Sequence, residues 1–210
     1  MAKNLVFQYA DYDESNTLWK KSSQSVAAYA KFFTEDYKLL TKGAPRNHKN
    51  GIFVPFLEGW YKDYDHLIYV ECDILATDVS ANIVGLYDET DINAGHANTG
   101  ILVKEKIITE HPYWTLGPVD DGVVIIPRDQ YDNFMKYVTH CQENDAYPTN
   151  GNVIHEYCMF QNKDVANLEY KFNYRMDRYE PKKKFWQTFI HYKEDKEQLE
   201  KDFDHPKFLK

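Results

Sequence analysis

The sequence has few cysteines and no long apolar run. Its 210 residues include three cysteines, Cys72, Cys141 and Cys158. An odd number at unrelated spacings predicts neither a disulfide framework nor a zinc cluster, so we expect buried thiols. No stretch approaches the roughly 18 to 20 apolar residues of a membrane helix, and the N-terminal residues lack the features of a signal peptide. We therefore expect a soluble, cytoplasmic protein without a membrane span.

Positive charge is also scarce. Lys and Arg number 25 against 33 Asp and Glu, which makes the formal net charge −8. This excess of acid disfavours broad binding to nucleic-acid phosphates, so we expect no nucleic-acid partner. It leaves open a local pocket that binds a diphosphate together with a metal ion. Hydrophobic residues make up 43% of the chain, enough for one sizeable core, so we expect a single domain over residues 1–210.

Apolar runs alternate with amphipathic ones through the first half of the chain. The predicted strands are LVFQYA (5–10), YKLL (37–40), HLIYVECDIL (66–75), NIVGLYD (82–88), GVVIIP (122–127), LEYKFNY (168–174) and FWQTFIHY (185–192). The predicted helices cover residues 17–33, 52–64, 130–141, 153–161 and 194–203. This alternation predicts an α/β fold, with a mostly parallel central sheet flanked by helices and ligands at the carboxyl ends of its strands.

One predicted strand, HLIYVECDIL, carries two carboxylates one residue apart, Glu71 and Asp73. Because a strand has a period of two, we expect both side chains on the same side. Two like charges so placed repel unless a cation or water lies between them. Mg²⁺ is usually held by one or two carboxylates, with phosphate and water as its other ligands. Taken alone, however, the pair is better explained as an acidic strand end facing solvent.

The order of the motifs resembles the nucleotide-sugar glycosyltransferases of the GT-A fold, a Rossmann-like α/β domain. In that superfamily a strand ends in a D-x-D motif that binds Mn²⁺ or Mg²⁺ on the donor diphosphate. Tyr64, Asp65, Tyr69, Glu71 and Asp73 follow the pattern, with Glu71 in place of the first Asp. The resemblance implies a metal-dependent enzyme with a UDP-sugar donor and a glycan or glycoprotein acceptor.

The late segment TFIHY is similar to a strand of the retaining, glycogenin-like enzymes of family 8. There it supplies a histidine as third metal ligand, which implies that His191 joins Glu71 and Asp73 and that transfer proceeds with retention. The family's following G-x-x-K-P-W is absent, so Lys193 or Lys196 is the candidate for its lysine contact to the diphosphate. Compact, acidic domains of this kind are similar to glycosyltransferases of large algal DNA viruses, which would place this one in the host cytoplasm.

The resemblance also implies where the nucleoside binds. At the end of the first strand, YADYD supplies Tyr9, Asp11 and Tyr12. An aromatic ring can stack on a uracil face, and a carboxylate can accept hydrogen bonds from ribose or base. Within the acidic motif, Glu71 and Cys72 are further candidates for contact with the nucleotide sugar.

A glycine turn is implied next to the donor sugar. Asp120-Asp121-Gly122 matches the family's N-x-G, where the backbone approaches the sugar and glycine leaves room. Asn98-Thr99-Gly100 matches in letters too, although spacing to the following helix favours Gly122. The candidate catalytic groups are Asp121 and Glu156. Glu156 would serve as nucleophile or as support for an oxocarbenium-like transition state.

Two other functions remain open. The first is a non-catalytic module that binds nucleotide sugars, which would fit the Glu in the metal motif and the missing K-P-W. The second is a sugar-phosphate nucleotidyltransferase, which shares the sheet. That class carries a Gly-rich loop and a basic residue after its first strand, and YADYDESN has neither. We therefore expect a hexosyltransferase-type enzyme first, a binding module second and a nucleotidyltransferase third.

Overall fold

The structure is a computed structural model that describes residues 3–10, 18–33, 35–41, 44, 48–78, 81–83, 90–96, 119–148, 153–163, 165–168, 170–176, 181–193 and 195–210. Asp11, Tyr12, the Asn98-Thr99-Gly100 motif and most of the predicted strand at 82–88 lie outside these ranges. Within the ranges, no helix is both long enough and apolar enough to cross a bilayer.

The larger of two β-sheets has six strands. In the order in which they pair, they are β2 (Asp36–Leu40), β1 (Asn4–Tyr9), β3 (His66–Val70), β6 (Val119–Pro127), β5 (Asn93–His96) and β7 (Ala166–Asn167). β1 pairs in parallel with β2 and β3, and β5 pairs in parallel with β7. β6 pairs antiparallel with both β3 and β5. The predicted α/β fold with a mostly parallel sheet is confirmed, and β6 makes both antiparallel pairs.

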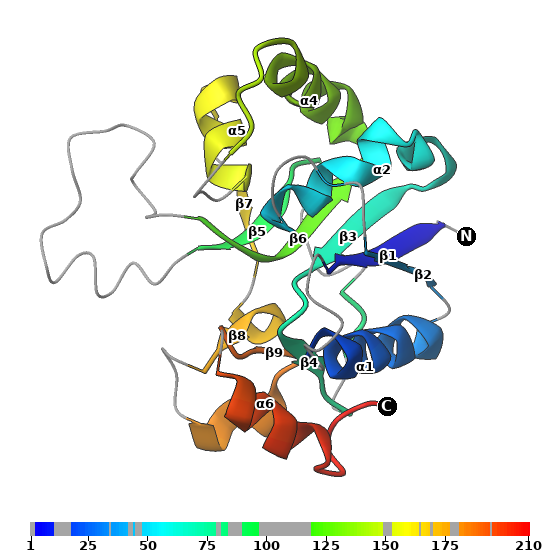
Figure 1. Ribbon diagram of the computed structural model, residues 1–210, viewed down its shortest axis with the longest axis vertical. Coiled ribbons are helices and arrows are strands. Elements are labelled where there is room, and N and C mark those ends of the chain that lie inside the picture. The colour runs from blue at the N-terminus through cyan, green and yellow to red at the C-terminus, as the bar shows by residue number, and fades with distance from the viewer. Residues whose placement is uncertain are drawn as a thin grey trace, which may run out of the picture.

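Further elements cover both faces of this sheet (Figure 1). On one face lie α2 (Val54–Leu57), α4 (Tyr131–Glu143) and α5 (Val153–Gln161), and on the other lies α1 (Leu18–Phe32). A smaller sheet beside α1 has the order β4 (Ile74–Ala76), β9 (Phe189–His191) and β8 (Tyr174–Arg175), and α6 (Lys196–Phe203) packs on it. The end of β3 leads directly into this smaller sheet.

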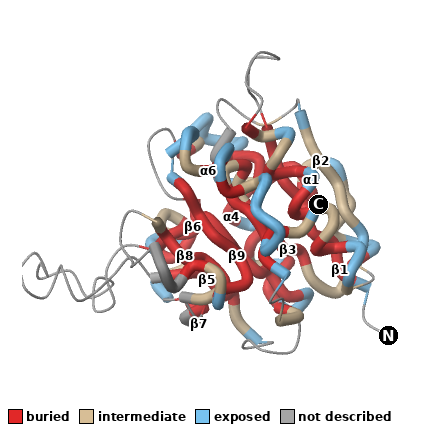
Figure 2. Tube along the Cα trace, turned by 90° about the horizontal axis from the view of Figure 1, so that it is seen from below, coloured by how far each residue is buried: buried red, intermediate tan, exposed pale blue. Residues whose placement is uncertain are grey.

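β3 is buried on both faces, as its unbroken apolar sequence predicts for a central strand. Leu67 and Tyr69 point into the core under α4 and α5, whereas Ile68 and Val70 point into the core under α1. Figure 2 shows buried residues running through β3 and its neighbour β6. The sheet is thus a rigid support for whatever side chains follow the end of β3.

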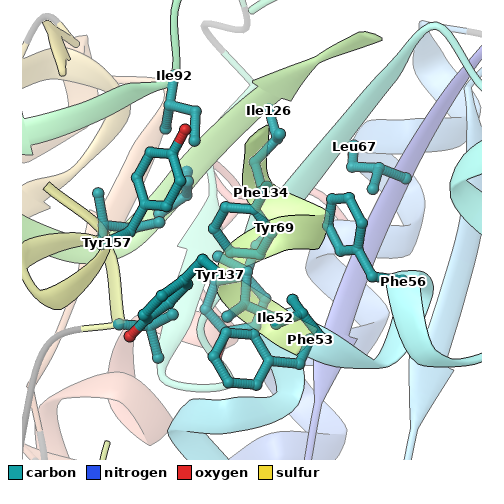
Figure 3. Packing of buried hydrophobic residues seen from close by; sticks show 14 of the residues in the cluster. Ile52, Phe53, Phe56, Leu67, Tyr69, Ile92, Ile126, Phe134, Tyr137 and Tyr157 are labelled. Carbon is teal, nitrogen blue, oxygen red and sulfur yellow. The ribbon is translucent and has the colours of Figure 1, made fainter. Parts of the chain in front are cut away.

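Aromatic rings fill the core under α4 and α5 (Figure 3). The ring of Phe134 lies at the centre, with its centroid 4.8 Å from that of Phe56, 5.2 Å from that of Tyr157 and 5.9 Å from that of Phe53. Burying each such ring contributes about 1.5 to 3 kcal/mol. This packing joins α2, α4 and α5 to one face of the sheet.

The predicted helix over residues 52–64 is broken into short pieces. A 3-10 turn (His48–Phe53), the one-turn α2 and a second 3-10 turn (Trp60–Asp63) occupy this region. Gly59 separates the last two with φ 74°, a left-handed conformation that ends helices and favours glycine. The apolar periodicity therefore identified buried positions but not a continuous helix.

Two predicted strands near the C-terminus are shorter than expected. The predicted strand at 168–174 contains a 3-10 turn, Tyr170–Phe172, before β8 begins. The predicted strand at 185–192 is extended only at β9, because another 3-10 turn runs from Pro181 to Trp186. Aromatic residues in these segments pack in cores without forming long strands.

Candidate metal centre

Glu71 and Asp73 follow β3 in a turn rather than in a strand. β3 ends at Val70 and β4 begins at Ile74. The Glu71 N–H donates to the Gly122 carbonyl at 2.8 Å, and the Asp73 carbonyl accepts from the Tyr192 N–H at 3.1 Å. The predicted strand over 66–75 is therefore wrong at residues 71–73, although both carboxylates do lie on the same side, toward His191. The backbone of each acid is held instead by a different neighbouring segment.

The two carboxylates meet at the side chain of His191, the last residue of β9. Nε2 of His191 lies 3.1 Å from Glu71 Oε2 and 3.3 Å from Asp73 Oδ1. One ligand atom from each of the three side chains lies within 4.8 Å of the others. The His191 side chain is 4% exposed, whereas those of Glu71 and Asp73 are 16% and 23% exposed. The cluster is therefore buried on the histidine side and reaches solvent on the acidic side.

The electrostatics of the cluster favour a positive charge at Nε2. Burial alone lowers the pKa of His191, but the Asp73 and Glu71 carboxylates outweigh burial and raise this pKa well above its ordinary value. A proton on Nε2 thus balances part of the negative charge of the two acids. A divalent cation would compete for the same position.

The far side of the His191 ring contacts a buried polar network. Nδ1 lies 2.9 Å from Asn173 Oδ1, and Asn173 Nδ2 donates to Asp120 Oδ1 at 3.0 Å. Arg175 Nη1 donates to Asp120 Oδ2 at 2.6 Å. Burial by itself raises the pKa of Asp120, but His191, Arg175 and Asn173 together lower it to about 2. Asp120 is therefore an ionised carboxylate inside the protein.

Gly122 makes room for this arrangement. A Cβ on Gly122 would lie 2.6 Å from His191 Nδ1 and 2.8 Å from Asn173 Oδ1. These distances are shorter than a Cβ atom makes to nonbonded neighbours in proteins. The sequence predicted that glycine leaves room for a donor sugar. In the structure the space beside Gly122 holds the His191–Asn173 contact, and contact with a sugar remains a prediction.

Asp121 and Glu156, the two candidate catalytic acids, lie toward α5 and α4. Because β6 alternates, the Asp121 side chain points away from Asp120, and its Oδ2 accepts from the N–H of Val153 at 3.2 Å, where α5 begins. Glu156 is half-buried in the first turn of α5, and burial raises its pKa. Its charge acts on Tyr137 and Cys141 of α4. The catalytic roles of both acids remain predictions.

Tyr9 and Cys72 join the end of β1 to the acidic turn. Cys72 Sγ donates to the Tyr9 carbonyl at 3.1 Å, and both side chains are buried. Burial, together with the charges of Asp73 and Glu71, raises the pKa of the Cys72 thiol well above its ordinary value. A protonated thiol is a poor metal ligand, so Cys72 supports the turn that carries the acids. The contacts of Tyr9 and Cys72 with a nucleotide remain predictions.

Lys193 and Lys196 lie just beyond His191. Lys193 is exposed in the turn after β9, with φ 42°, and Lys196 is exposed at the first position of α6. Both are on the C-terminal segment that supplies His191. This placement keeps them as candidates for a diphosphate contact.

The donor set suits a hard or borderline divalent cation. Two carboxylates are the ligands that Mg²⁺ and Mn²⁺ favour, and an imidazole is accepted by first-row metals such as Mn²⁺. With three protein side chains as ligands, several coordination positions remain for phosphate oxygens and water. Glu71, Asp73 and His191 therefore fit the metal that the sequence resemblance implies.

Comparison with known proteins shows likeness in structure but not in sequence. No family model and no curated protein sequence matches the chain. A glycosyltransferase involved in glycosylation of the major capsid of PBCV-1 superimposes with a TM-score of 0.64 and 11% identity, over 96% of this chain and 98% of that one. The glycosyltransferase GlyE of Streptococcus pneumoniae TIGR4 superimposes with a TM-score of 0.55 and 12% identity, over 91% and 54%.

A third similar structure is the bifunctional glycosyltransferase WbbM, with a TM-score of 0.51 and 9% identity over 97% of this chain and 50% of that one. The chain thus spans about half the length of GlyE and WbbM but nearly all of the viral protein. At identities this low, the structural likeness establishes a shared fold and nothing further. The chain has the GT-A-type fold of these glycosyltransferases, with a carboxylate–histidine cluster after the end of a central strand.

Proposed function

We propose that the protein is a metal-dependent glycosyltransferase that moves a sugar from a UDP-sugar to a hydroxyl of a glycan or glycoprotein. The observation that carries this proposal is the meeting of Glu71 and Asp73 with His191 at the end of β3. Glu71 and Asp73 come from one segment and His191 from another more than a hundred positions later, and the two segments meet in a fold shared with glycosyltransferases. Ligands of open α/β sheets bind at this edge.

The cluster would hold the metal in the proposed reaction, and residues near it would bind the rest of the nucleotide. Glu71, Asp73 and His191 would hold Mn²⁺ or Mg²⁺, which when bound neutralises negative charge on the leaving diphosphate. His191 would release the proton from Nε2 to become a ligand. The carboxylates would keep the site attractive to cations, and Lys193 or Lys196 would add positive charge beside the diphosphate. The nucleoside would lie at the end of β1, near Tyr9, Asp11 and Tyr12.

Transfer with retention is the stereochemistry that the resemblance to family 8 favours. A carboxylate near the anomeric carbon can support an oxocarbenium-like transition state. Of the two candidates, Asp121 directly precedes Gly122, whose carbonyl accepts from the N–H of Glu71 in the metal cluster. We expect Asp121→Asn to lower turnover more than Glu156→Gln, with UDP affinity little changed in either variant.

Calorimetric titration of UDP tests the binding half of the proposal. We expect UDP to bind in the presence of Mn²⁺ and not in EDTA, and to bind more tightly than GDP or ADP. Asp73→Asn should abolish Mn²⁺-dependent binding, because it removes one charged ligand. Asp132→Asn, an exposed position of α4, is the matched control and should bind like the unaltered protein. Unchanged UDP affinity in Asp73→Asn would remove the metal assignment.

Release of UDP from a panel of UDP-sugars tests the catalytic half. We expect Mn²⁺-dependent release that accelerates when an acceptor glycan is added, because transfer needs a hydroxyl. Tight UDP-sugar binding without release for any donor and acceptor would favour the non-catalytic binding module. Formation of a UDP-sugar from a sugar phosphate and UTP would favour the nucleotidyltransferase.

A further inference from the structure

We propose that Asn173, oriented by Asp120 and Arg175, is a positioning residue that directs the Nε2 lone pair of His191 at the metal. This inference rests on the proposed function, because it concerns how the chain prepares one metal ligand. It assigns a role to three buried residues that are not themselves ligands in the cluster.

The orientation of the Asn173 amide follows from its neighbour. Asp120 accepts from Arg175 Nη1 at Oδ2 and from the Gly122 N–H at Oδ1, as a carboxylate that acts only as an acceptor does. The group that faces Asp120 Oδ1 at 3.0 Å must therefore be the amide nitrogen of Asn173. The amide oxygen consequently faces Nδ1 of His191, at 2.9 Å.

The orientation of the amide determines which ring nitrogen of His191 carries a proton. An amide oxygen cannot donate, so Nδ1 must be the donor in the contact with Asn173. A neutral imidazole has one protonated nitrogen, and with the proton on Nδ1 the lone pair lies on Nε2. Nε2 is the atom that faces Glu71 and Asp73. The network thus selects the tautomer in which His191 can join the two acids as a ligand.

Arg175 and Gly122 hold this network in place. Arg175 Nη1 lies 2.6 Å from Asp120 Oδ2, and both side chains are 8% exposed, so the pair is buried and charge-balanced. The Gly122 N–H also donates to Asp120 Oδ1, at 3.2 Å. Metal-ligating histidines characteristically bind a second group through the other ring nitrogen, and altering that group typically costs about 10- to 100-fold in metal affinity.

The structure contains a matched control for this contact. At the start of β3, His66 Nδ1 lies 2.6 Å from Asn4 Oδ1, and the Asn4 side chain is buried like that of Asn173. Asn4→Ala therefore removes an equivalent asparagine–histidine contact at the opposite end of the strand. Any general cost of losing such a contact should appear in both variants.

Mn²⁺ alone is the probe for the experiment. Free Mn²⁺ is followed by electron paramagnetic resonance while it is titrated into the unaltered protein, Asn173→Ala and Asn4→Ala, with a thermal melt to establish folding. We expect Asn173→Ala to weaken Mn²⁺ binding at least 10-fold and Asn4→Ala to change it less than twofold. Equal affinity in Asn173→Ala and the unaltered protein would overturn the inference and leave the proposed function standing. Failure of the unaltered protein to bind Mn²⁺ would overturn both.

A second measurement needs no variant of Asn173. In protein labelled with ¹⁵N-histidine and saturated with Mg²⁺, ring ¹⁵N–¹H correlation spectra report which nitrogen is protonated, and His191→Gln identifies the His191 signals. We expect a proton on Nδ1 and none on Nε2. A proton on Nε2 would overturn the inference even if Asn173→Ala did not fold.

Discussion

At the start of β3, His66 Nδ1 lies 2.6 Å from Asn4 Oδ1, and beyond its end His191 Nδ1 lies 2.9 Å from Asn173 Oδ1. The same contact thus occurs near both ends of one strand. The neighbouring charges differ. At the start, the carboxylate of Asp65 lies 3.0 Å from Arg128 Nη2 and accepts from the Lys3 N–H at 2.8 Å.

At the end of β3, three carboxylates lie close to His191: Glu71, Asp73 and Asp120. His191 carries at most one positive charge, so the carboxylates around its ring outnumber it, although Arg175 also pairs with Asp120. An acid beside an arginine stabilises a fold, whereas an excess of acids around one buried histidine attracts a further cation. The comparison teaches that the surrounding charge, rather than the asparagine–histidine contact, distinguishes the candidate site.

The largest expected difference between the two ends of β3 is in the stability lost when the arginine at each end is replaced. Arg175→Met removes the ion-pair partner of the buried Asp120 carboxylate, which should lower the free energy of unfolding by up to about 3 to 5 kcal/mol. Arg128→Met should lower it by less than about 1 kcal/mol, because the Arg128 side chain is 54% exposed and its ion pair is screened by water. Urea denaturation measures both. Similar losses in the two variants would contradict the buried ion pair.

A smaller effect is expected from adding one methyl group at Gly122 of β6, which lies beside the end of β3. Gly122→Ala places a carbon in the contact between His191 and Asn173, so we expect it to cost about 1 to 3 kcal/mol of stability and at least about 10-fold in Mn²⁺ affinity. Gly95→Ala meets the same asparagine less closely, with Asn173 Nδ2 at 3.3 Å from the added carbon. It should have a weaker effect in both denaturation and Mn²⁺ titration. The reverse order would refute the geometry described around Asn173.

The pH dependence of stability should also report the charged form of His191. Because the pKa of His191 is raised in the folded protein, its protonation stabilises the metal-free fold fully below the unfolded value of about 6.5. That stabilisation is lost as pH rises through the folded pKa. The melting temperature of the metal-free protein should therefore fall as pH rises above neutral. His191→Gln should flatten this fall.

Metal binding should show the opposite dependence, because Mn²⁺ and the Nε2 proton compete for the same atom. Mn²⁺ affinity should rise with pH up to the folded pKa of His191. Thermal melts with and without Mn²⁺ across neutral to alkaline pH would measure both effects. A melting temperature that stays constant in the metal-free protein would show that His191 is not held in its charged form.

The smallest expected effect concerns Asp121, which faces away from the cluster. Asp121→Ala removes the acceptor at the start of α5, so we expect it to lower stability by about 1 kcal/mol. Its Mn²⁺ affinity should stay within about twofold of that of the unaltered protein. A large loss of Mn²⁺ binding would mean that Asp121 lies closer to the metal than its contact with Val153 indicates.

Much of the fold was predictable because it depends on local patterns. The apolar runs at 5–10 and 122–127 correspond to β1 and β6, and residues 153–161 form the predicted helix α5. The region at 52–64 was not predicted correctly, because a helical spacing of apolar residues does not show that Gly59 adopts a left-handed conformation. Composition and periodicity report burial more reliably than they report where elements break.

The residues of the candidate site also divide into those that the sequence predicted and those that it did not. Glu71, Asp73 and His191 were named from motifs, and the structure brings them together. Asp120 was the first residue of the Asp120-Asp121-Gly122 motif but was given no role of its own, and its shared side of β6 with Gly122 was the available signal. Asn173 and Arg175 carried no signal of their own, because Asp120, the carboxylate that both contact, is more than 50 positions away along the chain.

The sequence by itself determined the kinds of residue available: a strand apolar on both faces, two acids after it and a late histidine. It also determined the α/β class, since the alternation of apolar runs is local information. Only the tertiary structure decided that a turn, and not a strand, presents Glu71 and Asp73. Only the tertiary structure decided that Asp120 faces His191 while Asp121 faces α5. The physical reason is that these arrangements depend on hydrogen bonds and ion pairs between distant segments, and such contacts exist only once the sheets have packed together.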